Sequence, residues 1–184
     1  MVDVDNAAGG AVVHPTAEVE HGAKIGPGTR VWHLVHIRSS ATIGAGCTIG
    51  RNVYVDAGVT VGDFVKIQNN VSVYAGVTLG DEVFVGPSAV FTNDLRPRAR
   101  NAEWTITPTM VCRGASIGAN ATIICGTVIG AHAMVAAGSV VTRDVQPHQL
   151  VAGNPARHRG WVNRRGDVVS REATAPALDL LETE

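Results

Sequence analysis

The chain has 184 residues, enough for one ordinary domain with a buried core. Its formal net charge of -1 argues against a nucleic-acid-binding protein that relies on a broadly positive surface. The longest apolar run, Ala133 to Val141, is too short for a membrane span. The first ten residues resemble no export signal, and the three cysteines, an odd number, lack metal-binding spacing. We therefore expect a cytoplasmic protein without a nucleic-acid or membrane partner.

An apolar residue recurs at every sixth position in two stretches, from Val13 to Phe91 and from Val111 to Val141. A small or aliphatic residue follows four positions later, and a glycine or asparagine often precedes it. These glycines and asparagines are Gly28, Gly46, Asn52, Gly58, Asn70, Gly76, Gly114, Gly126 and Gly138. Both residue types tolerate positive φ, so we expect one tight turn per hexapeptide. A period of six favours short strands wound into a solenoid, with the two regular positions facing inward.

The repeat resembles the left-handed parallel β-helix of the hexapeptide acyltransferases, an all-β fold. In that fold three hexapeptides form one coil of about 18 residues around a triangular prism. We expect this domain over residues 12–155, after an N-terminal extension of residues 1–11. Residues 156–184 form a C-terminal segment, and its end is either disordered or a short helix at Ala177–Leu181.

The six-residue register breaks once, between Phe91 and Val111, which are 20 positions apart instead of a multiple of six. We place an inserted loop at residues 93–110. Loops that leave a rigid repeat array commonly carry function, although an ordinary solvated loop is the alternative. Three arginines at positions 96, 98 and 100 favour an anionic ligand here.

Polar residues on the expected prism surface are the next candidates. Coils about 4.8 Å apart would place His33 and Asn69 roughly 10 Å from each other. Gln68 and Asn69 either bind a ligand or form amide ladders between coils, whereas Asn70 is expected at a turn. Asn93 belongs to a different face from His33 and Asn69, so a site that uses both faces would form between two chains.

Three sequence strings are similar to those of bacterial nucleotide-sugar N-acetyltransferases: VWHLVHI at 31–37, VKIQNNVSVYAGV at 65–77 and VFVGPSAVFTNDLRPRA at 83–99. The ending AGNPARHRGW at 152–161 is similar as well, although AGNPA alone is common to many hexapeptide acyltransferases. The nearest resemblance is to enzymes that acetylate UDP-2-acetamido-3-amino-2,3-dideoxy-D-glucuronate for surface polysaccharide. Enzymes acting on dTDP-3-amino-3,6-dideoxyhexoses carry similar strings and are the alternative.

The resemblance implies acetyl-CoA as co-substrate, no metal, and catalysis mainly by positioning the two substrates. Asn93 is expected to anchor the acceptor amine through its carbonyl oxygen, and His33 is the reserve general base. Further acceptor-binding candidates are Gln68, Asn69, Tyr74, Arg96 and Arg98. The two arginines are expected to meet a uronate carboxylate or a diphosphate.

For the donor, the resemblance places CoA along the later coils of a homotrimer, between subunits. Backbone N–H groups near Gly118, Ala136 and Ala137 are expected to bind the pantetheine amides and to polarise the thioester oxygen. Arg157 and Arg159 are expected to pair with the CoA phosphates, or else belong to a solvated basic segment.

Two rival functions have sequence tests of their own. A γ-type carbonic anhydrase needs three histidines converging on zinc, and this chain has no histidine in the coils just after Gln68 and Asn69. A non-catalytic β-helix scaffold would need neither the three arginines of the loop nor polar residues such as Gln68 and Asn69 on the prism surface. Acetyl-CoA binding separates the scaffold from an enzyme.

Overall fold

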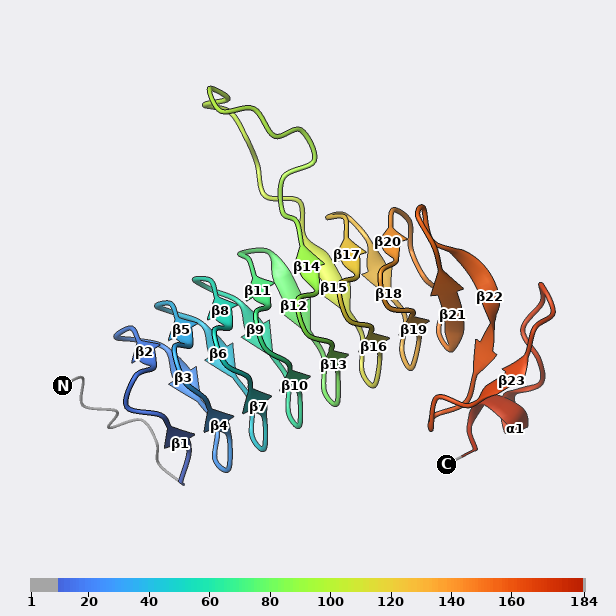
Figure 1. Cartoon of the computed structure of the whole chain (residues 1–184), viewed down its shortest axis with the longest axis horizontal. Helices are drawn as coiled ribbons and strands as arrows, with labels where there is room; N and C mark the ends of the chain where they lie inside the picture. Colours follow the sequence, from blue (N-terminus) through green and yellow to red (C-terminus); the bar gives the residue numbers. More distant parts are fainter. Residues whose placement is uncertain (1–9, 184) are drawn as a thin grey trace.

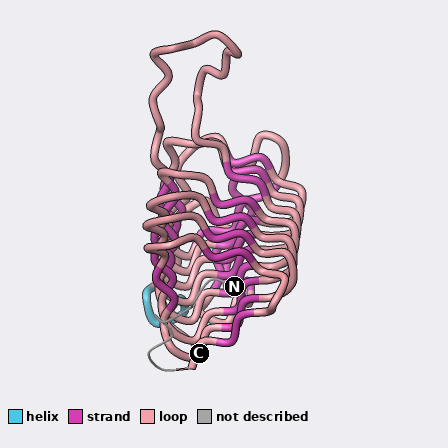
Figure 2. Tube along the Cα trace, turned by 90° about the vertical axis from the view of Figure 1, so that its left-hand side faces the viewer, coloured by secondary structure: helices cyan, strands magenta, loops and turns pink. Residues whose placement is uncertain are grey.

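The computed structural model describes residues 10–183, which form a left-handed parallel β-helix with three sheets as the sides of a prism (Figures 1 and 2). Sheet 1 contains β1 (Val12–Val13), β4 (Arg30–Val31), β7 (Thr48–Ile49), β10 (Lys66–Ile67), β13 (Phe84–Val85), β16 (Ser116–Ile117), β19 (Met134–Val135), β21 (Gln149–Ala152), β22 (Arg157–Val162) and β23 (Val168–Ser170). Sheet 2 contains β2 (Glu18–Val19), β5 (His36–Ile37), β8 (Tyr54–Val55), β11 (Ser72–Val73), β14 (Val90–Phe91), β17 (Thr122–Ile123) and β20 (Val140–Val141). Sheet 3 contains β3 (Lys24–Ile25), β6 (Thr42–Ile43), β9 (Thr60–Val61), β12 (Val77–Leu79), β15 (Thr109–Val111) and β18 (Val128–Ile129).

The register confirms the predicted coil of three hexapeptides. Val12 pairs with Arg30, and Lys66 pairs with both Thr48 and Phe84, each 18 residues away. Every repeat-start residue from Val19 onward is buried, so the predicted inward face is confirmed. Val13 lies in the first coil of the described residues and is only partly buried, because no coil within residues 10–183 covers it on the N-terminal side. The core is therefore a stack of aliphatic layers inside the prism.

The predicted turn residues are also confirmed. All nine glycines and asparagines named above have positive φ, between 57° and 92°. The same corner position is filled by larger residues elsewhere, including Leu34 and Phe64, both at φ 57°. Sequence pattern does not reveal these two, because neither residue type favours the left-handed region.

The register break is a loop that leaves the prism between sheets 2 and 3 and extends away from it (Figure 1). Leu79 pairs with Val111, 32 residues on, so 14 residues are added to the usual coil of 18. The loop begins after Phe91 and ends before Thr109. It is two residues shorter at its end than predicted, since Thr109 and Met110 pair with β12.

The C-terminal segment continues sheet 1 and does not form a separate body. Strand β21 ends the parallel array, and β22 and β23 add to it in antiparallel order. Helix α1 (Leu178–Leu181) confirms the helical alternative for the end of the chain, with Leu181 buried. Of the predicted N-terminal extension, residues 1–9 lie outside the described residues. Over residues 10–183, no helix is long and apolar enough to cross a membrane.

Candidate active site

Asn93 lies at the base of the loop, two residues after β14, at the prism edge between sheets 2 and 3. Its side-chain Nδ2 donates to the backbone carbonyl oxygen of Ala75 at 3.3 Å. The backbone carbonyl of Asn93 accepts the Thr107 N–H at 2.9 Å. A carbonyl oxygen can only accept, so the Asn93 amide must turn its nitrogen toward Ala75. Oδ1 remains as an acceptor without a hydrogen-bond partner within the described residues. This orientation suits an amine donor outside the prism.

Asp56 supports the Ala75 peptide from the coil before. Its Oδ2 accepts the Ala75 N–H at 3.2 Å, and its Oδ1 accepts the Ala57 N–H at 2.8 Å and the Tyr54 hydroxyl at 3.0 Å. Burial alone raises the pKa of Asp56, but the N–H groups of Ala57 and Ala75 and the Tyr54 hydroxyl outweigh it and lower the pKa. Asp56 therefore fixes the backbone of Ala75 through its N–H, and the carbonyl of the same residue holds the Asn93 amide in place.

The polar network continues along the same edge to the first coils. Arg38 contacts Asp56 at 3.5 Å and donates to Glu20 Oε1 at 3.0 Å, and the His36 ring lies 2.9 Å from the same oxygen. The Ser39 N–H and the His36 ring hold the pKa of Glu20 below its usual value. Sequence reasoning missed this network, although its spacing was a usable signal. Residues 20, 38, 56 and 74 follow one another at one coil's distance and alternate in charge as Glu, Arg and Asp before Tyr.

Tyr74, a predicted acceptor-binding residue, also lies at this edge, directly after β11. Its ring is exposed and lies 5.9 Å from the Tyr54 ring, tilted by 57°. An exposed aromatic ring is a suitable surface for the apolar face of a sugar.

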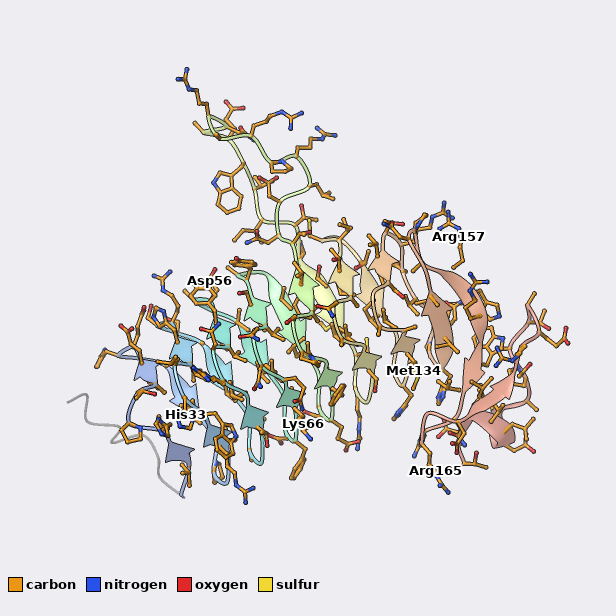
Figure 3. All side chains as sticks on the ribbon, in the orientation of Figure 1. His33, Asp56, Lys66, Met134, Arg157 and Arg165 are labelled. Carbon is orange, nitrogen blue, oxygen red and sulfur yellow. The ribbon has the colours of Figure 1, made fainter. Side chains whose placement is uncertain are left out.

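His33 and Asn69 lie at the other edge of sheet 2, where it meets sheet 1, and therefore on a different edge from Asn93, as predicted. Figure 3 labels His33 among the first coils. His33 is exposed, and its ring stacks on His14 at 3.6 Å. Asn69 Oδ1 accepts the Arg51 N–H at 2.9 Å, which is the amide link between coils that was the alternative to ligand binding. Gln68 and Asn69 line a groove on this side together with Trp32, whereas His33 does not line it.

The loop arginines are exposed. Arg96 donates its backbone N–H to Asp94 Oδ1 at 2.8 Å, and the Arg98 guanidinium donates to the Pro97 carbonyl at 2.7 Å. Neither guanidinium contacts a carboxylate within residues 10–183. Both charges are therefore available to an anion, in the loop that extends away from the prism (Figure 1).

The predicted donor-binding peptides are only partly available. The N–H groups of Gly118 and Ala136 donate to Val135 and Val151 at 2.8 and 2.9 Å, so they are not free to bind pantetheine amides. The Ala137 N–H makes no hydrogen bond within the described residues and remains a candidate. Gly118 has a structural reason to be glycine, since a Cβ there would lie 2.4 Å from the Ala137 nitrogen.

Arg157 and Arg159 point out from β22 and are exposed. Arg157 lines a hollow of about 180 Å³ at the C-terminal end of the prism, together with Arg143, which sequence reasoning did not select. Arg157 donates to the Ala156 carbonyl at 3.0 Å.

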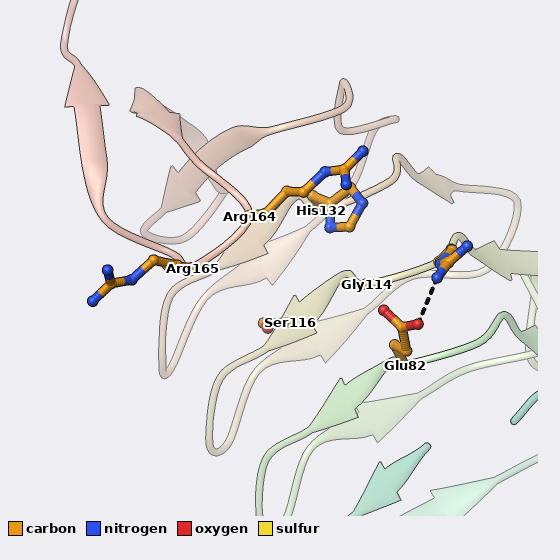
Figure 4. A pocket seen from close by; sticks show the side chains of 7 residues that line it. Glu82, Gly114, Ser116, His132, Arg164 and Arg165 are labelled. Carbon is orange, nitrogen blue, oxygen red and sulfur yellow. Dashed lines mark hydrogen bonds and ion pairs between the residues drawn. The ribbon is translucent and has the colours of Figure 1, made fainter. Parts of the chain in front are cut away.

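A hollow of about 590 Å³ lies on the sheet 1 side near the C-terminal segment (Figure 4). Arg113 and Glu82 on its wall form an ion pair at 2.6 Å, and Arg164 pairs with Glu182. Burial, then the neighbouring His148 and Arg164, lower the pKa of His132. Since the hollow's charges pair with one another, we treat it as a structural contact with the C-terminal segment. No group of three or more metal-ligating side chains occurs within residues 10–183.

The comparison with protein families decides the class. The pattern of the bacterial transferase hexapeptide (six repeats) matches residues 22–57, 58–93 and 108–143, and the hexapeptide repeat of succinyl-transferase matches 40–75. The chain belongs to the hexapeptide-repeat transferases. The break between 93 and 108 in these matches coincides with the loop that leaves the prism.

Individual relatives are sugar or hexapeptide acetyltransferases. A dTDP-3-amino-3,6-dideoxy-α-D-galactopyranose 3-N-acetyltransferase of Aneurinibacillus thermoaerophilus is 46% identical over 54 residues, which span 29% of this chain and only 28% of that protein. A hexapeptide-repeat acetyltransferase of Vibrio cholerae, solved with acetyl-CoA, is 34% identical over 66% of this chain and 70% of the other, with a TM-score of 0.58. A mutant GDP-perosamine N-acetyltransferase of Caulobacter crescentus, solved with CoA and GDP-perosamine, is 27% identical over 82% of this chain and 56% of the other, with a TM-score of 0.54.

Proposed function

We propose that the protein transfers the acetyl group of acetyl-CoA to the 3-amino group of a nucleotide-linked amino sugar. The observation that carries this proposal is the orientation of Asn93, whose Nδ2 is held by the Ala75 carbonyl while Oδ1 is left as an acceptor. The relatives named above, which include aminosugar N-acetyltransferases, support the same reaction class.

The chemistry needs a neutral amine aimed at the thioester carbonyl. Asn93 Oδ1 accepts one N–H of the amine and so directs the nitrogen lone pair at that carbon. The new C–N bond forms, the C–S bond breaks, and the leaving CoA sulfur receives the proton that the nitrogen loses. We propose the Ala137 N–H, which makes no hydrogen bond within the described residues, as the donor to the oxyanion. Positioning of this kind lowers a barrier by up to roughly 7–11 kcal/mol.

Two acceptors compete within this function. The strings shared with UDP-aminouronate N-acetyltransferases favour UDP-2-acetamido-3-amino-2,3-dideoxy-D-glucuronate, whose carboxylate would meet Arg96 or Arg98. The Aneurinibacillus relative acts on a dTDP-3-amino-3,6-dideoxyhexose, which has no carboxylate, and this favours the alternative.

A panel of UDP- and dTDP-linked 3-amino sugars decides between them, with thiol release from acetyl-CoA followed by DTNB. Turnover with the UDP-uronate alone supports the first acceptor, and turnover with a dTDP sugar supports the second. Absence of thiol release with every amine in the panel contradicts the proposed acceptor class.

We also propose that the protein works as a homotrimer with sites between chains. Asn93 and the groove at Gln68 lie on opposite edges of sheet 2, and the loop arginines belong to the loop that extends away from the prism (Figure 1). A neighbouring chain would bring such separated groups together. Measurement of the mass in solution tests this, and a monomer of 19.2 kDa that retains turnover would overturn it.

A further inference from the structure

The groove on sheet 1 has a lining that the proposed catalytic step does not use. It has a volume of about 300 Å³ and runs over neighbouring coils of the first half of the prism. Six aromatic, polar or charged side chains line it: Trp32, Thr48, Arg51, Lys66, Gln68 and Asn69. Lys66 points outward from β10, and Arg51 follows β7 at the corner of the prism.

The two cations of the groove have no carboxylate partner within residues 10–183. By contrast, Arg38 and Arg113 each pair with a glutamate on this chain. Arg51 and Lys66 are exposed on adjacent coils of one groove, and Thr48 lies beside Lys66 in the sheet. Two unpaired cations beside a hydroxyl are suited to two linked phosphate groups.

The third component is aromatic. The Trp32 side chain is 47% exposed, whereas Trp161 is packed in the C-terminal segment at 3%. An indole that faces solvent beside cations provides a stacking surface for a nucleobase. Gln68 adds a side-chain amide with both a donor and an acceptor. This side-chain amide makes no hydrogen bond within the described residues. Asn69 has already used its oxygen on the Arg51 N–H, so Gln68 is the better placed of the two to read a base edge.

We propose that this groove binds the nucleoside diphosphate of the acceptor, with the base on Trp32 and the diphosphate on Arg51 and Lys66. The proposal rests on the proposed function for the identity of the ligand. Coenzyme A also contains a nucleoside diphosphate, but the candidate donor peptide at Ala137 is four coils beyond Arg51. At one strand spacing per coil that is roughly 19 Å along the prism. Arg143 and Arg157, by contrast, line a hollow beside β20, the strand that follows Ala137, so the CoA phosphates have cations nearer to Ala137 and the groove is left to the acceptor.

The direct test is calorimetric titration of the intact protein with UDP, dTDP and CoA, without any amino sugar. Arg51→Ala and Lys66→Ala are compared with Lys24→Ala, which removes a cation that is also exposed, from sheet 3. We expect UDP or dTDP to bind roughly tenfold or more weakly to each groove variant, because each loses a charge-assisted contact to phosphate. The Lys24 variant and the affinity for CoA are expected to stay unchanged.

Trp32 offers an independent signal. In a Trp104→Phe background the exposed tryptophan fluorescence comes from Trp32, since Trp161 is buried. Stacking of a base is expected to quench it on addition of UDP or dTDP, and Trp32→Ala is expected to weaken nucleotide binding by about fivefold or more.

Three results would overturn the proposal: no binding of UDP or dTDP, unchanged nucleotide affinity in both groove variants, or a loss confined to CoA. Failure of the proposed function gives a different pattern, namely groove-dependent nucleotide binding without thiol release for any amine. Conversely, acetylation with an unchanged acceptor KM in the Arg51→Ala/Lys66→Ala double variant removes the groove and leaves the function.

Discussion

Replacement of Asn93 by alanine separates catalysis from folding. The side chain makes one hydrogen bond, Nδ2 to the Ala75 carbonyl, and at 3.3 Å it is long. Its loss is expected to reduce the free energy of unfolding by about 1 kcal/mol or less. The backbone contact that closes the loop, from the Thr107 N–H to the Asn93 carbonyl, does not involve the side chain. For a chain of this length, the midpoint of thermal unfolding should fall by only about 2–4 °C.

The effect on turnover is expected to be far larger. Without Oδ1 the amine loses the acceptor that directs its lone pair, and the interaction is worth most in the transition state, when the nitrogen gains positive charge. Removal of one such oriented polar group costs roughly 2.7–4 kcal/mol, or a factor of about 10² to 10³ in kcat. DTNB-monitored thiol release at saturating acetyl-CoA measures this loss.

Asn101→Ala is the matched control, since Asn101 lies in the same loop and also makes one side-chain hydrogen bond, accepting the Glu103 N–H at 3.0 Å. It is expected to keep kcat within about threefold, a change too small for a residue that contacts the reacting atoms. If the Asn93 variant keeps its turnover, or if both variants lose it equally, the assignment of the amine anchor is wrong.

Mixing equal amounts of the Asn93→Ala and Arg51→Ala proteins should restore full turnover and acceptor affinity in about a quarter of the sites if each site combines two chains, and no recovery after subunit exchange would place both residues in one chain's site. His33→Ala is expected to leave the pH profile of kcat unchanged, because the leaving CoA sulfur receives the proton in the proposed step; a lost acidic limb would make His33 the base. Asp56→Asn should lower stability at neutral pH by about 1–3 kcal/mol, since Asp56 has a lowered pKa and its charged form is stabilised. That difference should shrink as the pH falls through the folded-state pKa, and equal melting temperatures of both proteins at pH 7 would contradict it. His132 has a lowered pKa, so below about pH 6.5 the unfolded chain binds the extra proton and the fold loses stability; His132→Asn, which suits the φ of 55° there, should flatten the melting temperature between pH 7.5 and 5.5, and an unchanged slope would refute this.

The fold could be predicted from the sequence because the hexapeptide repeat is a pattern of neighbouring residues in the chain. Each buried repeat-start residue, such as Ile37 or Ile67, sits above an equivalent one a coil away, so period and architecture are the same information. Positive φ at Asn52 and Asn70 follows from the residue type. The break in that period predicted the loop, but the predicted end of the loop was two residues too late. Nothing in the sequence indicated that β15 begins before Val111, with Thr109 and Met110.

The candidate site was readable only in part. Asn93 and Tyr74 were selected by resemblance, and Gln68 and Asn69 by being polar where a prism wall needs no polarity. The Asp56 network was missed because its members are 18 residues apart and each one, taken alone, is an ordinary surface charge.

What the sequence determined by itself is therefore the left-handed β-helix and the class of repeat that builds it. Only the tertiary structure decided which polar atoms are still free to bind. The N–H groups of Gly118 and Ala136 are used between coils, whereas Asn93 Oδ1 and the Ala137 N–H are not. The physical reason is that hydrogen bonds between coils join residues far apart in the chain, 17 positions for Gly118 and Val135 and 15 for Ala136 and Val151. Whether an atom has a partner therefore depends on which residue the neighbouring coil places beside it.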